Sequence, residues 1–101
     1  REETRNPEHR RHSMTAPVSL TEAKLFLRVE HDAVDGLIQT LIEAAQARVE
    51  GEVGVALDVT SAAPLRLAVL MLVLRAYERG ERDMPIAPVA AWIAPYLGVR
   101  L

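Results

Sequence analysis

The stretch DGLIQTLIEAAQARVE, residues 35–50, places its apolar side chains at the three- and four-residue steps of one helix face. The apolar positions are Leu37, Ile38, Leu41, Ile42, Ala45 and Val49. Glutamine and glutamate occupy the opposite face, at Gln39, Glu43, Gln46 and Glu50. The pattern predicts an amphipathic helix of about five turns that ends near Gly51 and packs its apolar face against a core.

Capping residues indicate where two helices begin. Ser19 precedes LTEAKLFLR and Glu22 follows three residues later, which is the pattern of a capping box and predicts a helix over residues 20–28. Before the longer helix, Asp32 suits the N-cap and Asp35 occupies the place of the reciprocal acid. Both carboxylates also favour the positive end of the helix dipole.

The same segment also admits a metal site, because His31, Asp32 and Asp35 carry side chains that bind divalent cations. No second histidine or acidic cluster lies at a compatible spacing elsewhere in the chain. Capping uses both aspartates and leaves His31 as an exposed loop residue. We therefore expect helix caps here and no metal.

A third helix is expected over residues 64–79, with Pro64 as its first residue and Gly80 as its C-cap. Its middle, LAVLMLVL, is apolar on every side, and such a helix must be surrounded by protein. A small domain supplies only part of that cover, so neighbouring subunits are expected to supply the rest. The run is far shorter than the roughly 17–25 residues of a membrane span, which favours a soluble, intracellular protein without membrane contact.

The carboxyl end carries the strongest signal for binding a partner. PVAAWIA, residues 88–94, predicts a short fourth helix that Pro95 ends, followed by an extended tail. The candidate partner-binding residues are Trp92, Ile93, Tyr96, Leu97, Val99 and Leu101, since aromatic anchors are typical of interfaces. The alternative for Trp92 is that it closes the small core. Four helices and no convincing strand predict an all-α fold, a small bundle with a flexible amino-terminal arm and an extended carboxyl-terminal tail.

The chain has 101 residues, no cysteine and a net charge of −2. This length predicts one small domain, and the absence of cysteine excludes disulfides, thiolate zinc sites and thiol catalysis. Residues 1–13, REETRNPEHRRHS, have no aliphatic or aromatic side chain and read as a polar arm before a helical domain over residues 14–101. The motif HRRH in that arm could bind metal or nucleic acid, but the neighbouring glutamates favour a solvated tail.

Catalytic motifs are missing from the sequence. The serines lack a glycine-rich elbow, and GEVGV, residues 51–55, lacks the lysine of a phosphate-binding loop. We therefore expect no catalytic residues, no cofactor and no enzymatic activity.

Three segments in order resemble a known family. SLTEAKLFLRVEHDAVDGLIQTLIEAAQARVEGEVGVAL, residues 19–57, resembles the opening of the phage head–tail connector (adaptor) family of long-tailed phages, prophages and gene transfer agents. PLRLAVLMLVLRAYERGE, residues 64–81, resembles its proline-led apolar helix, and APYLGVRL, residues 94–101, resembles its closing Pro-Tyr segment. Leu97 departs from the arginine that often follows Pro-Tyr in the family.

The resemblance implies a structural protein of a virion or phage-like particle, assembled in the host cytoplasm. It implies a twelvefold ring of identical subunits that binds the portal protein and a stopper or tail-terminator protein. DNA would pass through the ring's channel without sequence-specific binding. The alternative is a small helical DNA-binding or packaging accessory protein with a helix-turn-helix, but its recognition helix would carry Glu43 and Glu50 beside a single central Arg48.

Overall fold

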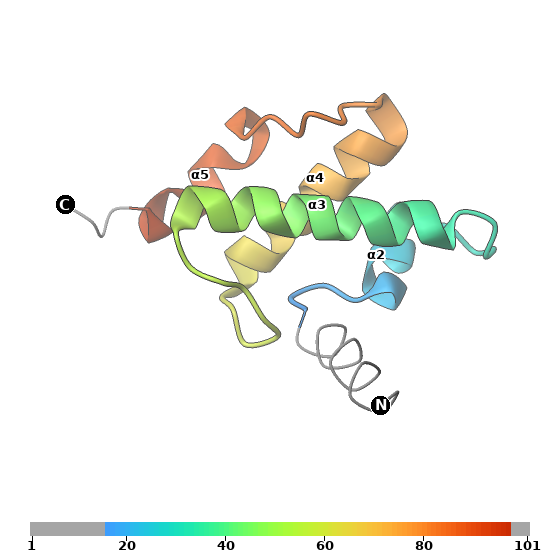
Figure 1. Ribbon diagram of the computed structural model, residues 1–101, viewed down its shortest axis with the longest axis horizontal. Helices are drawn as coiled ribbons and strands as arrows, with labels where there is room; N and C mark the ends of the chain where they lie inside the picture. Colours follow the sequence, from blue (N-terminus) through green and yellow to red (C-terminus); the bar gives the residue numbers. More distant parts are fainter. Residues whose placement is uncertain (1–15, 98–101) are drawn as a thin grey trace, which may run out of the picture.

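The computed structural model describes residues 16–97, and this part of the chain is helical without any strand (Figure 1). In chain order the elements are α2 (Leu20–Leu27), α3 (Asp35–Val53), α4 (Ala63–Arg79), η1 (Ala87–Val89), α5 (Ala90–Ile93) and η2 (Ala94–Tyr96), where η marks a 3-10 turn. The all-α prediction is confirmed. Within the described residues, no helix has the length and apolar character needed to cross a membrane.

The core lies where α3 and α4 cross, with α2 beside the amino-terminal half of α3 and α5 near its carboxyl end (Figure 1). The largest fully buried side chains come from α3 and α4, from the short elements that close the far end, and from Pro17 before α2. Those of the helical elements are Ile38, Ile42, Val49, Val69, Leu72, Val73, Val89 and Ile93. The predicted amphipathic helix over residues 35–50 is confirmed, because its apolar face forms one side of the core.

The capping box predicted at the start of α2 is present. The Glu22 backbone N–H donates to Ser19 Oγ and the Ser19 backbone N–H donates to Glu22 Oε1, each over 3.0 Å. The helix ends at Leu27, and Arg28 takes a left-handed conformation with a φ of 64° as its C-cap. These two ends fix α2 as a short helix that stops one residue before the predicted end, with Arg28 as its cap.

The predicted capping of α3 is wrong. The helix begins at Asp35, its N-cap is Val34, and no side chain caps it. Residues 31–34 form a turn instead, in which the Asp35 backbone N–H donates to the Asp32 carbonyl over 3.3 Å. The physical reason lies in α2, because both carboxylates pair with Lys24 and neither accepts a hydrogen bond from the first backbone N–H groups of α3.

The carboxyl end of α3 also differs from the prediction, since the helix passes Gly51 and ends at Val53. Gly54, with a φ of 80°, is the C-cap, and its N–H donates to the Glu50 carbonyl over 2.8 Å. The additional residues bury Val53 in the core, which favours continuing the helix. Of the two glycines near this end, Gly51 and Gly54, only Gly54 has the left-handed backbone that glycine adopts without strain.

The segment after α4 is fastened to both long helices. Gly80 caps α4 with a φ of 72°, as predicted, although the helix starts one residue earlier than expected, at Ala63. In the following loop, the Met84 carbonyl accepts from Arg48 Nε of α3 over 3.0 Å. Arg82 Nε donates to the Ala76 carbonyl of α4 over 2.9 Å. These bonds hold the loop that leads to α5 and so fix where α5 packs on α4.

The short α-helix α5 ends at Ile93, before Pro95 as predicted, but a 3-10 turn follows it. Pro95 lies inside this turn, η2, at one of its first positions, where its missing N–H costs no hydrogen bond. Tyr96 belongs to that turn, and Leu97 follows it as a turn residue, so the prediction of an extended tail is wrong for these two residues. The rest of the predicted tail and the predicted arm over residues 1–13 lie outside the described residues.

Candidate interaction surface

Helix α4 has one face buried by the described chain and one face that is only partly covered. The buried face consists of Leu65, Ala68, Val69, Leu72, Val73 and Ala76. On the other side Leu67 is 37% exposed, and Leu70, Met71 and Leu74 are half-buried. The sequence indicated that this helix needs protein on all sides, and the described residues provide it on one side.

A groove lies along the first two turns of α4, between this open face and α5. Its lining consists of Ala63, Pro64, Arg66, Leu67, Leu70 and Trp92, and its volume is about 410 Å³. We call it the α4–α5 groove. Aliphatic side chains of α4 form most of its surface, and the half-buried indole of Trp92 contributes from α5. An aromatic wall over an aliphatic floor is the usual composition of an apolar binding site.

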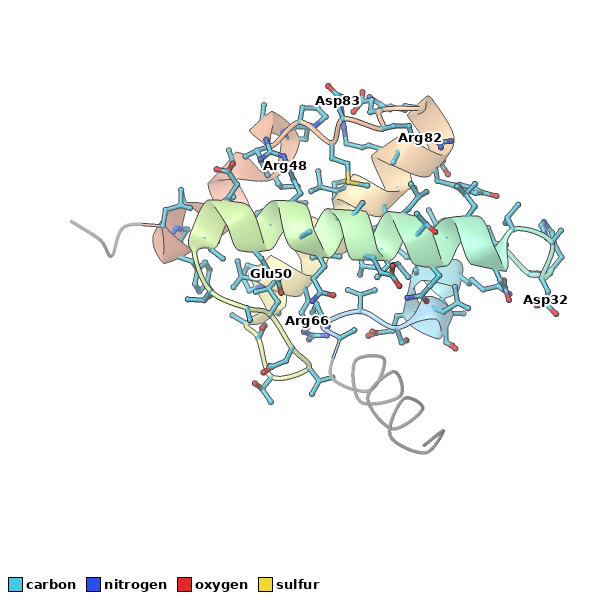
Figure 2. All side chains as sticks on the ribbon, in the orientation of Figure 1. Asp32, Arg48, Glu50, Arg66, Arg82 and Asp83 are labelled. Carbon is cyan, nitrogen blue, oxygen red and sulfur yellow. The ribbon has the colours of Figure 1, made fainter. Side chains whose placement is uncertain are left out.

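Arg66, which Figure 2 labels, supplies the charge in the lining of the groove. Its Nη1 lies 3.9 Å from Glu22 Oε2, at the long limit of an ion pair. Its Nε is buried without a hydrogen-bond partner among the described residues. The aliphatic stem of the arginine therefore adds apolar surface, while the weakly held guanidinium can turn towards an acceptor.

The predicted partner-binding residues separate into three groups. Ile93 is fully buried in the core, so it cannot contact a partner and that prediction is wrong. Trp92, Tyr96 and Leu97 are partly buried and pack against the same core, so the alternative reading, in which the indole closes the core, holds in part. Val99 and Leu101 lie outside the described residues. Of the predicted set, Trp92 is the side chain that the structure brings to the groove.

The polar cluster between α2 and α3 is an ion-paired turn. Lys24 Nζ lies 2.9 Å from Asp32 Oδ1 and 2.8 Å from Asp35 Oδ1, so an ammonium occupies the place between the two carboxylates that a cation would take. His31 Nδ1 accepts from the Ala33 backbone N–H over 3.2 Å. Within residues 16–97 no three or more histidine or acidic side chains come together as a metal site. This cluster joins α2 to the start of α3 through ion pairs.

The ion pairs shift two pKa values in the turn. The pKa of Lys24 is raised because Asp35, and after it Asp32, accept hydrogen bonds from the ammonium. The pKa of Asp32 is lowered mainly because Lys24 donates to its carboxylate. The Asp32 side chain is 90% exposed, so solvent screens this interaction and its contribution to stability is small.

The surface of α3 gives little support to the DNA-binding alternative. Arg48 is already engaged, because Nη1 lies 2.8 Å from Glu52 Oε2 while Nε donates to the Met84 carbonyl (Figure 2). On the opposite side of the helix, Glu50 Oε2 accepts from the Leu57 backbone N–H over 2.8 Å (Figure 2). The central arginine of the supposed recognition helix therefore holds the protein's own loop, and exposed Glu43 would repel phosphates.

Three groove residues, Pro64, Leu67 and Leu70, were not predicted to bind a partner, since the sequence indicated Pro64 only as a helix start and the leucines only as part of an apolar stretch. The signal that could have found them is the all-apolar middle of α4, which requires cover that a small domain cannot give. That stretch identifies α4 as the helix that needs cover, but it does not indicate which side of the helix stays exposed. The open side is decided by where α5 packs, and the short α5 has no strong periodicity of its own.

Comparison with family models places the chain beside a known family. The model described as phage gp6-like head-tail connector protein matches residues 17–85. The matched range is more than half of the chain and contains α2, α3 and α4. Comparisons with curated proteins and with solved structures gave no significant match. The match therefore includes the α4 side of the groove and stops before Trp92.

Proposed function

This chain belongs to the family of phage gp6-like head–tail connector proteins, and we propose that it forms a ring of identical subunits beneath the portal of a phage-like particle. The family has a structural role at the junction between head and tail, and members interact with portal and tail components of the virion. Catalysis forms no part of that role. The finer steps below are our proposal for how this chain fulfils it.

The observation that carries the proposal is the open apolar face of α4. Burying one leucine side chain completely stabilises an assembly by about 1.5–3 kcal/mol. Leu67, Leu70 and Trp92 lie together on this face, so a neighbour that covers them gains several such contributions. A contact between two different patches on identical subunits closes into a ring when the rotation allows it. We therefore assign the contact between adjacent subunits to the α4–α5 groove.

The ring has a channel, and the charge of the chain suits a channel that DNA traverses. A net charge of −2 provides no surface that neutralises phosphates, so DNA slides past without being held. By resemblance to the family we propose twelve subunits, with the portal protein on one face of the ring and a stopper or tail-terminator protein on the other. The assembled site is the head–tail interface of the particle, and assembly takes place in the host cytoplasm.

A deletion of the gene in a strain that makes the particles tests the proposal. A connector joins DNA-filled heads to tails, so we expect full heads and free tails to accumulate separately in electron micrographs. A copy of the gene supplied in trans restores tailed particles. Tailed particles of normal number in the deletion strain would contradict the proposal.

A size measurement separates the DNA-binding alternative. The purified protein is run through a size-exclusion column with light-scattering detection, with and without duplex DNA. A connector elutes at the same size in both cases, since its surface lacks the positive charge that holds a duplex. A DNA complex that dissociates steeply with added salt would favour the accessory protein instead.

A further inference from the structure

The two long helices present opposite faces to the outside of the subunit. Helices α3 and α4 cross in contact, with α3 in front of α4 in Figure 1, and each buries one face in the core between them. Their outward faces therefore lie on opposite sides of the subunit. The outward face of α4 is apolar and consists of Ala63, Leu67, Leu70, Met71 and Leu74. The outward face of α3 is exposed and consists of Gly36, Thr40, Glu43, Ala44, Ala47 and Gly51.

Most side chains on the outward face of α3 are small. Ala44, Ala47 and Gly51 follow one another at helical steps, and a Cβ added at Gly51 would lie in open space. Gly51 also has no positive φ, so nothing within the described subunit requires glycine there. Glycine in a helix interior is less favourable than alanine and is used where another chain or ligand comes close to the backbone. The composition of this face therefore suits a second chain packed directly on the helix.

This face can lie deeper in an apolar groove than a face with large side chains. The distance between packed helices, about 8–10 Å, depends on the side chains at the contact. In the α4–α5 groove the large side chains are Leu67, Leu70 and Trp92, which all lie on the accepting side. A hollow of about 460 Å³ lies beside Ala47 and Gly51, between α3 and the loop after α4, and gives these large side chains room. The two outward surfaces are thus complementary in size.

Charge decides between this face and a second groove as the partner. Arg66 lies in the lining of the groove, and its Nε is buried without a hydrogen-bond partner among the described residues. A contact between two grooves would bring two copies of this arginine together, which is unfavourable. The outward face of α3 instead carries Glu43, which is exposed and lies one turn, about 5–6 Å, before Ala47. Its carboxylate is an acceptor with which the guanidinium of a second copy can pair.

We propose that the α4–α5 groove of each subunit binds the outward face of α3 of the adjacent copy, centred on Ala47, with Arg66 paired to Glu43 across the contact. The proposal rests on the ring proposed above, and it names the surface that covers the groove. The groove and the α3 face are different patches on opposite sides of one subunit, which is the requirement for a head-to-tail contact that closes. Each subunit thus donates one α3 face and accepts one.

Pairs of cysteines test this contact directly, because the chain has no cysteine of its own. One chain carries Leu67→Cys in the groove together with Ala44→Cys, Ala47→Cys or Gly51→Cys on α3, and particles assembled from it are oxidised. The two cysteines of one chain lie on opposite sides of the crossed helices, beyond the separation of about 7 Å between Cα atoms that a disulfide spans. Each bond therefore joins two subunits, and we expect at least one of the three pairs to give a ladder of linked multimers on a non-reducing gel.

Two controls identify the contact. A single cysteine has no partner in a head-to-tail contact, so each single variant should run as the monomer. Leu67→Cys combined with Leu25→Cys, which is 74% exposed on α2, should give no ladder.

Each other outcome overturns the proposal in a recognisable way. Dimers from Leu67→Cys alone would mean that two α4 faces meet, which excludes α3 as the partner of the groove. A ring that is present in the particles, but in which none of the three pairs links more than the Leu25→Cys control, overturns the contact between groove and α3 and leaves the ring intact. Particles without any ring of this chain overturn the contact together with the proposed function.

Discussion

The ion-paired turn between α2 and α3 and the α4–α5 groove both present clustered side chains at the surface. The charges of the turn are paired within the subunit, whereas the apolar side chains of the groove remain partly exposed. In the turn, Lys24 lies within 3 Å of two carboxylates and satisfies the charges inside one subunit. In the groove, Leu67 and Leu70 line an apolar surface together with Trp92, and Leu67 is 37% exposed. Charged groups can pair locally across a turn, whereas apolar area is removed from water only by more protein. The cluster that looked like a ligand site is therefore structural, and the apolar side of a helix is the candidate interface.

The largest effect is expected on assembly. Leu67→Glu places a charge in the groove, and a buried unpaired charge at an interface is strongly unfavourable. We expect this variant to fold, because the position is already 37% exposed, but to be missing from purified particles. Leu25→Glu, on α2, adds the same charge at a position that is 74% exposed and should assemble normally. Quantitative mass spectrometry of particles reports both, and normal incorporation of Leu67→Glu would remove the groove from the interface.

The two faces of α4 give a matched pair for stability. Leu72→Ala, on the buried face, should lower the free energy of unfolding by about 2–5 kcal/mol, because it leaves a cavity in the core. Leu67→Ala, five residues earlier on the same helix, should lower it by at most about 1 kcal/mol, because much of that side chain is already in solvent. Urea denaturation followed by circular dichroism measures the difference. Equal losses would mean that the groove side of α4 is covered in the free subunit.

The two capping predictions can be compared in the same way. Ser19→Ala removes the hydrogen bond to the Glu22 backbone N–H and should cost about 0.5–2 kcal/mol. Asp32→Ala removes only a screened ion pair, since Asp32 caps no helix, and should lower the unfolding midpoint less than Ser19→Ala. The midpoints of thermal unfolding are compared at low salt. A larger loss for Asp32→Ala would restore the capping role that the structure removes.

The smallest effect is the pH dependence of the ion-paired turn. The pKa of Asp32 is lowered by Lys24, so its contribution to stability is present above the unfolded value of about 3.9 and is lost as the pH falls through the folded value. The pKa of Lys24 is raised, so its contribution is present below about 10.4 and is lost as the pH rises through the folded value. Asp32→Asn should thus be less stable than the wild-type protein at neutral pH and equally stable in acid. A difference that stays constant into acid would mean that the carboxylate's charge is not what stabilises the turn.

The fold was predictable where it depends on local signals in the sequence. The apolar steps of residues 35–50, the capping box at Ser19 and the glycine at position 80 are local signals, and the corresponding elements are present. The two ends of α3 were not predictable from such signals. Its start depends on Lys24, which belongs to another helix, and its end depends on the burial of Val53 against the rest of the core.

The candidate site was predictable only in part, for a similar reason. An all-apolar stretch indicates that α4 needs cover, but its periodicity cannot say which side the subunit leaves open. That side is set by α5, which is held through the loop that Arg48 and Arg82 fasten to the long helices. Trp92 was identified from its residue type, while Leu67 and Leu70 required the packing of two elements far apart in the chain.

The central claim is that the open face of α4 is the contact between adjacent subunits of a ring, and a density map of the head–tail junction at side-chain resolution tests it most directly. We predict a closed ring in which Leu67, Leu70 and Trp92 of each subunit are covered by the next copy. A two-fold dimer at the junction, or a ring in which this face of α4 points into solvent, would contradict the claim.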